Sequence, residues 1–429
     1  MPAATAVLVN VPALFLQDDR RQPPGGLVSI ATYADRLGYD ISICDLAGET
    51  LTRSLCDNIP EADIYGFSCY TPTYQETLLL QRELRDRYPQ AIFVAGGPHA
   101  SALPEDVARD FDCVVTGEGE EAFAEILRCV STRQRARIPR TWHASPILKL
   151  DDLPFPDFEH FCTMTRYTRR LHGEPTICLD SSRGCNNRCR FCNSHVNPRG
   201  FWRARSARSI AEEVKWHYER GWRAYRFNDD HFVADPARTI EICELLAPLK
   251  ITFRIFSRAE SFINREVCEW LVRAGCRHVG VGIESFSSRI LALMGKATSV
   301  ARITAGLHTA REYGLTVRGF FIVGFPGETD ETVRESLAIL ADTPLDEATV
   351  YPCIPYPGSA LFDDPGHYGI NWMDPDYSHY VQVGRDRSTG YVMRTATFGA
   401  AEMRRWRDDY MATFSRLGIA WCDERKEII

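Results

Sequence analysis

The sequence predicts an α/β protein: an N-terminal Rossmann-like domain with a doubly wound parallel sheet, then a (β/α)6 partial TIM barrel, then a short C-terminal helical cap. Two observations predict this class. Short apolar segments alternate with amphipathic helical segments over residues 5–128, and the alternation resumes at Pro175 after a polar, proline-rich interruption. Strands and helices that alternate form parallel sheets, which bind ligands at the carboxyl ends of their strands. The expected domain boundaries are 1–130, 131–174, 175–358 and 359–429.

The N-terminal domain is expected to contain five strands, because its apolar segments are separated by helical periodicity or by glycine. The strands are TAVLVNV, ISICD, DIYGFS, AIFVAGG and CVVTG. The helices are LVSIATYADRL, the stretch from Tyr74 to Arg87, and EEAFAEILRCV. Residues 131–174 include RQRARIPR and LDDLPFPDF, and this mixture of basic residues, proline and aspartate is typical of a linker.

Further apolar segments predict the six strands of the barrel, and each except the last is followed by a helical stretch. They are TICLDS, AYRFND, ITFRIFS, HVGVGIE, VRGFFIVGF and EATVYPCIP. In such a barrel the loops at the carboxyl ends of the strands carry the chemistry. The segment from residue 359 mixes aromatic residues with proline and glycine and ends in the amphipathic helix AAEMRRWRDDYMATFSRL. It is expected to cap the barrel, with Tyr377, His379 and Tyr380 either lining a pocket or packed as ordinary aromatics.

The charge balance argues against a protein that coats nucleic acid. The formal net charge is -7 and the pI is about 5.9, so no net positive field attracts phosphates. No apolar run is long enough to cross a bilayer, and no basic residues precede the N-terminal apolar run. We therefore expect a cytoplasmic protein that binds neither nucleic acid nor membranes.

One group of cysteines differs from the rest. Most of the 15 cysteines stand singly in apolar runs, as small buried residues do, and in a reducing compartment they stay unpaired. Cys185, Cys189 and Cys192 instead form C-x₃-C-x₂-C in the polar segment SSRGCNNRCRFCNSH, directly after the first barrel strand. Such thiolates favour an iron–sulfur cluster or zinc. Zinc needs a fourth ligand, which His195 could supply, whereas three ligands on a [4Fe–4S] cluster leave one iron open to substrate.

The cysteine motif, with Phe191 at its aromatic position and Arg183-Gly184 before it, resembles the signature of the radical S-adenosylmethionine (SAM) superfamily over about residues 175–355. The resemblance implies that the open iron binds SAM and that an electron, from a flavodoxin- or ferredoxin-type donor, cleaves SAM. This cleavage usually produces a 5′-deoxyadenosyl radical. Phe191 would then lie near the adenine.

Other strand ends match positions where this superfamily contacts SAM. Asp229 and Asp230 follow the second barrel strand and would hold the methionine amino group, although acidic pairs are often solvated loop residues. Arg258 would pair with the SAM carboxylate, unless it is a surface arginine. The remaining expected SAM contacts are Ser257 beside Arg258, and Glu284 and Ser285 at the end of the fourth strand.

The N-terminal segments PPGGLVSIATYADRLGYDISICDLAG, DIYGFSCYTPTYQET, VAGGPHAS and DCVVTGEGEEAF resemble the cobalamin-binding domain that is fused to radical SAM cores. The resemblance implies that the nucleotide tail of cobalamin lies between strand ends made of small residues. The expected contacts are Ser68, Thr71, Gly96, Gly97 and Gly117. The histidine of the Asp-x-His-x-x-Gly motif is missing from VNVPALFLQDDR, so cobalt would have an open lower face or a different capping residue.

Alternatives remain for this domain. The domain could be a scaffold that binds no cofactor, because a fold does not guarantee a functional binding site. A nicotinamide site is disfavoured, since G-x-G-x-x-G is absent after the first strand and the acidic GEGEE would repel phosphate. His99 is expected to be an exposed loop residue and not a cobalt ligand.

The resemblances imply a cobalamin-dependent radical SAM methyltransferase that acts on an unactivated carbon of a small molecule, with secondary metabolism as the expected setting. In such enzymes one SAM methylates the cobalamin and a second SAM provides the radical. The alternatives are a radical SAM cyclisation, rearrangement, oxidation or transfer of another SAM-derived group, and a zinc-stabilised binding protein without turnover.

Overall fold

The computed structural model describes residues 4–194, 202–382 and 390–421. Its N-terminal domain is a parallel sheet with strand order β2-β1-β3-β4-β5-β6. The strands are β1 (Thr5–Asn10), β2 (Asp40–Asp45), β3 (Ile64–Ser68), β4 (Ile92–Gly96), β5 (Cys113–Thr116) and β6 (Thr141–His143). The helices are α1 (Gly25–Arg36), α2 (Tyr74–Arg87), α3 (Gly97–Ala102), α4 (Pro104–Val107) and α5 (Gly119–Ser131).

This sheet is doubly wound, as predicted. One apolar core lies between the sheet and α1 and α5, and a second lies between the opposite face and α2, α3 and α4. The strand order reverses between β1 and β3, and such a switch point leaves a crevice at the carboxyl edge of the sheet. The five predicted strands and the three predicted helices are all present.

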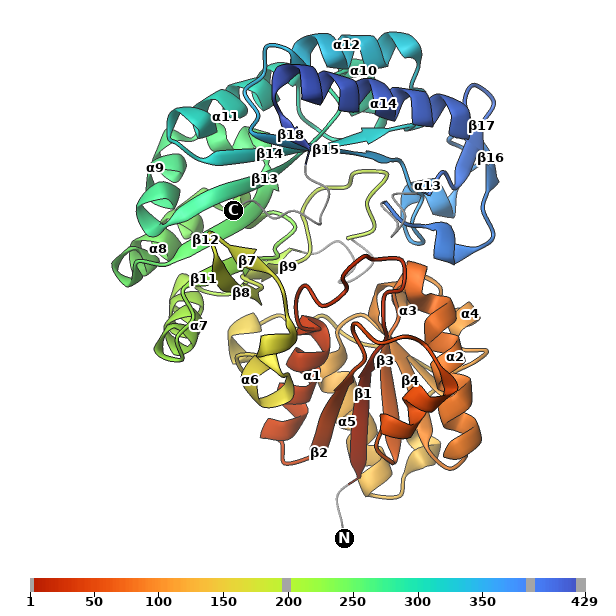
Figure 1. Ribbon diagram of the computed structural model, residues 1–429. Helices are drawn as coiled ribbons and strands as arrows, with labels where there is room; N and C mark the ends of the chain where they lie inside the picture. Colours follow the sequence, from red (N-terminus) through yellow and green to blue (C-terminus); the bar gives the residue numbers. More distant parts are fainter. Residues whose placement is uncertain (1–3, 195–201, 383–389, 422–429) are drawn as a thin grey trace.

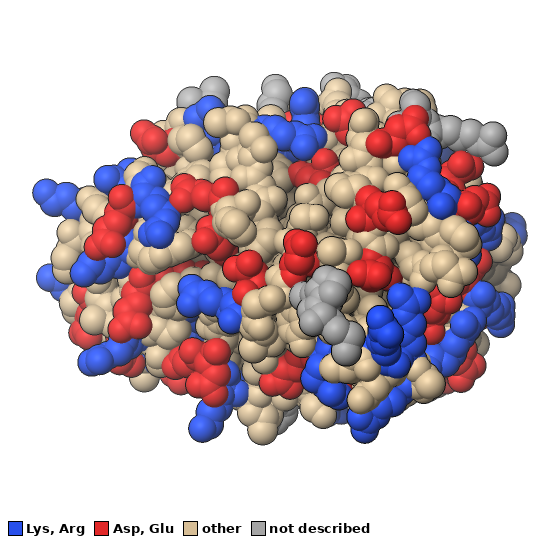
Figure 2. All heavy atoms as spheres, turned by 90° about the horizontal axis from the view of Figure 1, so that it is seen from below, with Lys and Arg blue, Asp and Glu red and all other residues tan. Residues whose placement is uncertain are grey.

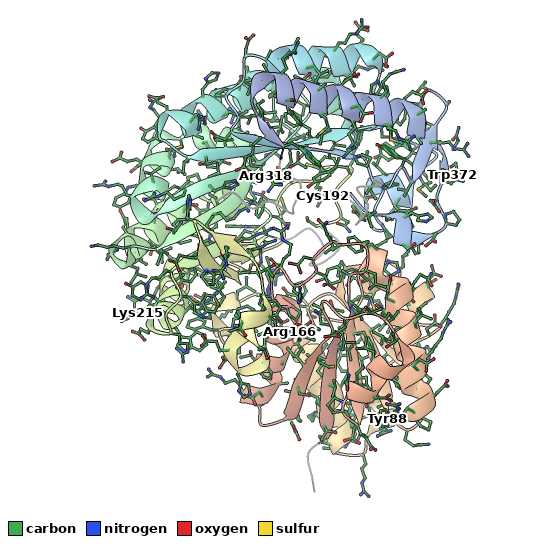
Figure 3. The ribbon with its side chains drawn as sticks, in the orientation of Figure 1. Tyr88, Arg166, Cys192, Lys215, Arg318 and Trp372 are labelled. Carbon is green, nitrogen blue, oxygen red and sulfur yellow. The ribbon has the colours of Figure 1, made fainter. Side chains whose placement is uncertain are left out.

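The segment 131–174 is more than a linker. Within it, β6 pairs in parallel with β5, with Val114 opposite Thr141, and it completes the sheet. Three residues without periodicity do not predict a strand, whereas the open edge of β5 provides the hydrogen-bonding partners for one. The segment is also attached through Arg166, which donates to the carbonyl oxygens of Asp45 at 3.1 Å and Ala47 at 2.8 Å (Figure 3).

The second domain is a curled sheet with strand order β18-β15-β14-β13-β12-β11-β8-β7. The six predicted barrel strands are adjacent and parallel in chain order. They are β8 (Glu174–Leu179), β11 (Ala224–Phe227), β12 (Thr252–Arg258), β13 (Cys276–Glu284), β14 (Thr316–Val323) and β15 (Glu347–Pro352). Their convex side is covered by α7 (Ala207–Glu219), α8 (Pro236–Leu246), α9 (Arg265–Ala274), α11 (Val300–Glu312) and α12 (Asp330–Leu340) (Figure 1).

The last helix, α14 (Ala400–Leu417), takes the place of a sixth barrel helix. It lies beside α12 and packs on β14 and β15, with Met403, Tyr410 and Phe414 fully buried (Figure 1). Before it, β16 (Ile370–Met373) and β17 (Met393–Thr395) form a small hairpin. The short turn Tyr377–His379 contacts the N-terminal domain beside α2. The C-terminal segment therefore both completes the barrel and bridges the domains.

The two domains meet with the carboxyl ends of their strands facing one another. Residues that follow β3, β4 and β5 line one cavity together with residues that follow β8 and β11. Seen from below, the surface has acidic and basic side chains interspersed (Figure 2). Among the described residues no helix is both long and apolar enough to span a bilayer.

Candidate functional site

The cysteine motif lies in a loop at the carboxyl end of β8, as expected. Gly184 adopts a φ of 82°, which only glycine tolerates easily, and the chain turns there into the three half-buried cysteines. The amide of Cys192 donates to the carbonyl of Cys189 at 3.1 Å. Figure 3 places Cys192 between the concave side of the half-barrel and the N-terminal domain. The loop thus presents its thiols to the space between the domains.

This loop is anchored to the barrel through Arg190. The Arg190 amide donates to Met294 O at 2.9 Å and its side chain to Leu293 O at 2.8 Å, at the end of α10 (Ser288–Leu293). The amide of Leu361 donates in turn to the Arg190 carbonyl at 3.3 Å. Because the anchors use the backbone and the arginine, the cysteine side chains remain available.

The thiols lie in an enclosed environment. Burial raises the pKa of Cys192 to about 11 and also raises the pKa of Cys189. Metal binding must therefore displace protons, as thiolate ligation does generally. Within the described residues no three His, Cys, Asp or Glu side chains converge on one ion position. His195, the proposed fourth zinc ligand, lies outside the described residues.

The expected SAM contacts gather around this loop, and several already have protein partners. Asp229 is buried and accepts hydrogen bonds from Ser181 and Ser182, so it holds the turn before the cysteines. Both aspartates line the cavity between the domains, and burial raises the pKa of Asp230. Because Asp229 is already bound by two serines, Asp230 is the carboxylate of the pair that is freer to bind a ligand.

Arg258 is not a surface residue. It donates to Asn187 Oδ1 in the cysteine loop at 3.0 Å and pairs with Glu260 at 2.5 Å. Its side chain is only 12% exposed. Beside it, Ser257 is buried, and its hydroxyl has no partner among the described residues.

The end of β13 contributes a charged pair. Glu284 has a φ of 66°, which is unusual for a residue with a side chain, and it accepts from Lys296 Nζ at 2.9 Å. Lys296 was missed by the sequence analysis, because it lies 12 residues beyond its partner with no motif around it. Ser285 is fully buried and bonded to Ser336 at 3.1 Å, so its hydroxyl does not reach the site in this arrangement. Phe191 is partly buried against the barrel core.

A cavity of about 330 Å³ enters the N-terminal domain between the sheet and helices α1 and α5. Glycines make room for it. A Cβ at Gly66 would lie 2.6 Å from Leu8, whereas at Gly96 the nearest atom would be 3.8 Å away. Three of the expected tail contacts, Gly96, Gly97 and Gly117, line this cavity, as does Ser68. We call this cavity the slot, and its volume lies within the range of ligand pockets in proteins.

A second cavity of about 490 Å³ adjoins the slot at the carboxyl edge of the sheet. Thr71 lines this cavity and not the slot, and its hydroxyl lies 3.2 Å from His99 Nδ1. Tyr70 borders both cavities with 51% of its surface exposed. The described residues that line the two cavities include no histidine, in agreement with the missing cobalt-binding motif.

His99 corrects one expectation. It is not an exposed loop residue but lies in α3, only 1% exposed, between the rings of Tyr74 and Tyr377. Burial lowers its pKa to about 4. The sequence placed it in a loop because the double glycine before it is typical of one, whereas Gly96-Gly97-Pro98 here begins a helix.

Comparison with known proteins defines the class. A model of the radical SAM superfamily matches residues 179–340, and a model of the B12 binding domain matches residues 19–127. The chain is 30% identical to an uncharacterized methyltransferase of Pyrococcus horikoshii, over 80% of this chain and 78% of the relative. It is also 25% identical to an anaerobic magnesium-protoporphyrin IX monomethyl ester cyclase of Cereibacter sphaeroides, over 79% of this chain and 58% of that protein.

Among solved structures, the fold is similar to that of TsrM from Kitasatospora setae, described as a radical S-adenosylmethionine methyltransferase with cobalamin and a [4Fe–4S] cluster bound. The TM-score is 0.72 at 15% identity, over 97% of this chain and 88% of that one. The chain belongs to the radical SAM superfamily, in the branch that carries a B12 binding domain. It is a radical SAM enzyme, and the expected cofactors, a [4Fe–4S] cluster, SAM and cobalamin, are those of its two domains.

Proposed function

We propose that this enzyme is a cobalamin-dependent methyltransferase that adds a methyl group to an unactivated carbon of a small molecule. The observation that carries the proposal is the shared cavity. Its lining runs from the strand ends of the B12 binding domain to Asp180 and to Ser182, Arg183 and Gly184, the last of which directly precedes Cys185. When bound, the cluster and SAM supply a carbon-centred radical and the cobalamin supplies the methyl group.

The residues of this chain would divide the work of binding and orientation. Cys185, Cys189 and Cys192 would hold the cluster on three irons. Asp230, which faces the cavity, would accept from the methionine amino group, and Arg258 would orient the SAM carboxylate beside Asn187.

The slot would hold the nucleotide tail of cobalamin through Ser68, Gly96, Gly97 and Gly117. Thr71, next to the second cavity, would contact the corrin side instead of the tail. The substrate would enter that second cavity, where both cofactors can reach it. We further propose a flavodoxin- or ferredoxin-type electron donor.

The products formed from SAM distinguish methyl transfer from the other radical reactions. Anaerobic protein with reconstituted cluster and hydroxocobalamin is incubated with SAM, titanium(III) citrate and a small-molecule extract, and SAM products are quantified by mass spectrometry. Methyl transfer yields S-adenosylhomocysteine and 5′-deoxyadenosine together. Formation of 5′-deoxyadenosine without S-adenosylhomocysteine, with cobalamin bound, would reject methyl transfer and favour a cyclisation or rearrangement, the outcome to which the cyclase relative points.

Cysteine variants provide the controls for this experiment. Replacing Cys189 by Ala is expected to remove nearly all iron and all SAM cleavage. Replacing Cys243, which is fully buried in the barrel core, is expected to leave both intact and only to lower stability. SAM cleavage that survives Cys189→Ala with full iron content would contradict the proposed cluster site.

A further inference from the structure

Both ends of the cysteine loop carry an arginine. Strands β9 (Ser182–Arg183) and β10 (Arg203–Ala204) pair antiparallel, with Arg183 directly opposite Arg203. The cysteine motif follows the first arginine in the sequence and precedes the second. Cys185 follows Arg183 by two positions. The two-stranded ribbon of β9 and β10 therefore flanks the cysteine motif, and we call this ribbon the stem of the cysteine loop.

Both arginines bind one carboxylate of the other domain. Glu118, at the start of α5, accepts from Arg183 at 3.1 Å and from the two terminal nitrogens of Arg203 at 2.8 Å and 3.0 Å. Glu118 also accepts from the amide of Ile147 at 2.6 Å. The side chains of Glu118 and Arg203 are only 7% and 4% exposed. Bidentate, buried charge pairs of this kind are directional and poorly screened.

A second carboxylate extends the contact. Glu120 accepts from Arg183 at 2.6 Å and from the hydroxyl of Ser29 in α1 at 2.7 Å. Burial by itself would raise the pKa of Glu120, but the charge and hydrogen bonds of Arg183 and the bond from Ser29 more than offset it, so the pKa is lowered. The pair is thus ionised at neutral pH. Glu118 and Glu120 of the acidic GEGEE segment, which argued against phosphate binding, thus bind the arginines of the stem.

The same side chains form a wall of the slot. Glu118, Glu120, Arg183 and Gly184 all line the cavity assigned to the cobalamin tail. We propose that this network, made of Glu118, Glu120, Arg183 and Arg203, positions the cluster loop against the cobalamin slot. Its members are positioning residues. The identity of the two cofactors rests on the proposed function, whereas the contact between the stem and α5 does not.

Three variants test the network. Glu118→Gln removes the charge that both arginines share. The double variant Glu118→Gln/Arg203→Gln replaces the charged pair by a neutral pair. Unlike the single variant, it does not leave the buried charge of Arg203 without its partner, so it is less prone to unfold. Arg205→Gln is the matched control, because Arg205 follows β10 and forms an equally buried pair with Glu213 in α7, inside the barrel domain.

Hydrogen exchange of the chain with cluster and without cobalamin measures the contact directly. In Glu118→Gln and in the double variant, peptides that cover 117–121 and 145–148 are expected to exchange at least about tenfold faster than in the wild type, because a buried charge pair is broken. In Arg205→Gln these two peptides should exchange at the wild-type rate. Equal exchange in the wild type and both Glu118 variants would overturn the proposal.

Electron paramagnetic resonance measures the positioning. With bound cob(II)alamin and a reduced cluster, the wild type is expected to show one defined magnetic interaction between the two spins. The double variant should retain cobalt and about four irons per chain while this interaction broadens or weakens. An unchanged interaction would overturn the positioning role. If the wild type fails to retain cobalamin, the proposed function fails, and the exchange experiment still decides the network.

Discussion

The charged side chains at the barrel strand ends are held by partners from distant parts of the chain. Asp229 is bound by Ser181 and Ser182, Arg258 by Asn187, and Glu284 by Lys296. A buried charge is costly unless it is paired, so these contacts fix the geometry before any ligand arrives. They also show why residue type alone does not tell which carboxylate is already engaged: both aspartates line the cavity, but Asp229 is bound by two serines.

His99 makes stability depend on pH. Its folded pKa of about 4 lies below the value of about 6.5 of an unfolded histidine, so stability is full above pH 6.5 and falls as the pH drops toward 4. The loss should approach about 1.4 kcal/mol per pH unit within that window. Urea unfolding at pH 7.5 and 5.5 should show a smaller loss for His99→Gln than for the wild type. The exposed His367→Gln serves as the control, and an equal loss in all three proteins would refute the assignment.

At the scale of elements, the slot lies where β4 ends at Gly96, where Gly117 follows β5, and where Gly66 lies within β3 beneath α1 and α5. Glycines at strand ends let a ligand approach the backbone. At Gly96 a Cβ would meet no atom nearer than 3.8 Å, and the backbone φ of −145° admits any residue. A side chain placed there should therefore occupy the slot without disturbing the fold.

Gly96→Val is expected to lower cobalamin retention at least about tenfold, while iron content stays unchanged, because overfilling a close-packed site excludes the ligand. Cobalt and iron are measured together after reconstitution with hydroxocobalamin. Gly366→Val, in an open and exposed position far from the slot, is the control. Full cobalt retention in Gly96→Val would show that the ligand tail lies elsewhere.

In the whole molecule, the carboxyl edges of the two sheets face each other. Three features join the domains: the segment 131–174, the turn at Tyr377 and the Glu118 network. Residues next to the cysteine motif, Gly184 and Asn193, therefore line the same adjoining cavities as the strand ends of the N-terminal sheet. An interface that uses buried charge and aromatic contacts holds a defined relative position better than a flexible linker does.

Ligand binding should therefore stabilise the protein measurably. Hydroxocobalamin at about 100 times its dissociation constant adds about 2.7 kcal/mol to the native state. For cooperative unfolding of all 429 residues, the thermal midpoint should rise by roughly 3 °C. Differential scanning fluorimetry with and without hydroxocobalamin measures this shift, and Gly96→Val should show none. A midpoint that does not respond in the wild type would count against a cobalamin site.

Most of the fold was predictable, because long strands and helices carry a periodicity of their own. The exceptions are short: β6, with three residues, and β18 (Ala420–Trp421), with two, join sheets at open edges that exist only in the folded protein. The cysteine motif could be recognised because its three cysteines are local in sequence, and their role as cluster ligands stays a prediction. The pair Glu118–Arg203 was not, since 85 positions separate its members.

The sequence by itself determined the two domain types, the C-x₃-C-x₂-C motif and the absence of the cobalt-binding histidine motif, because these are local patterns of spacing and apolar periodicity. Only the tertiary structure decided that two serines bind Asp229, that His99 is buried, and that the arginines on both sides of the cysteine loop bind Glu118. The physical reason is that burial and ion pairing depend on which distant segments the two sheets bring to their shared edge.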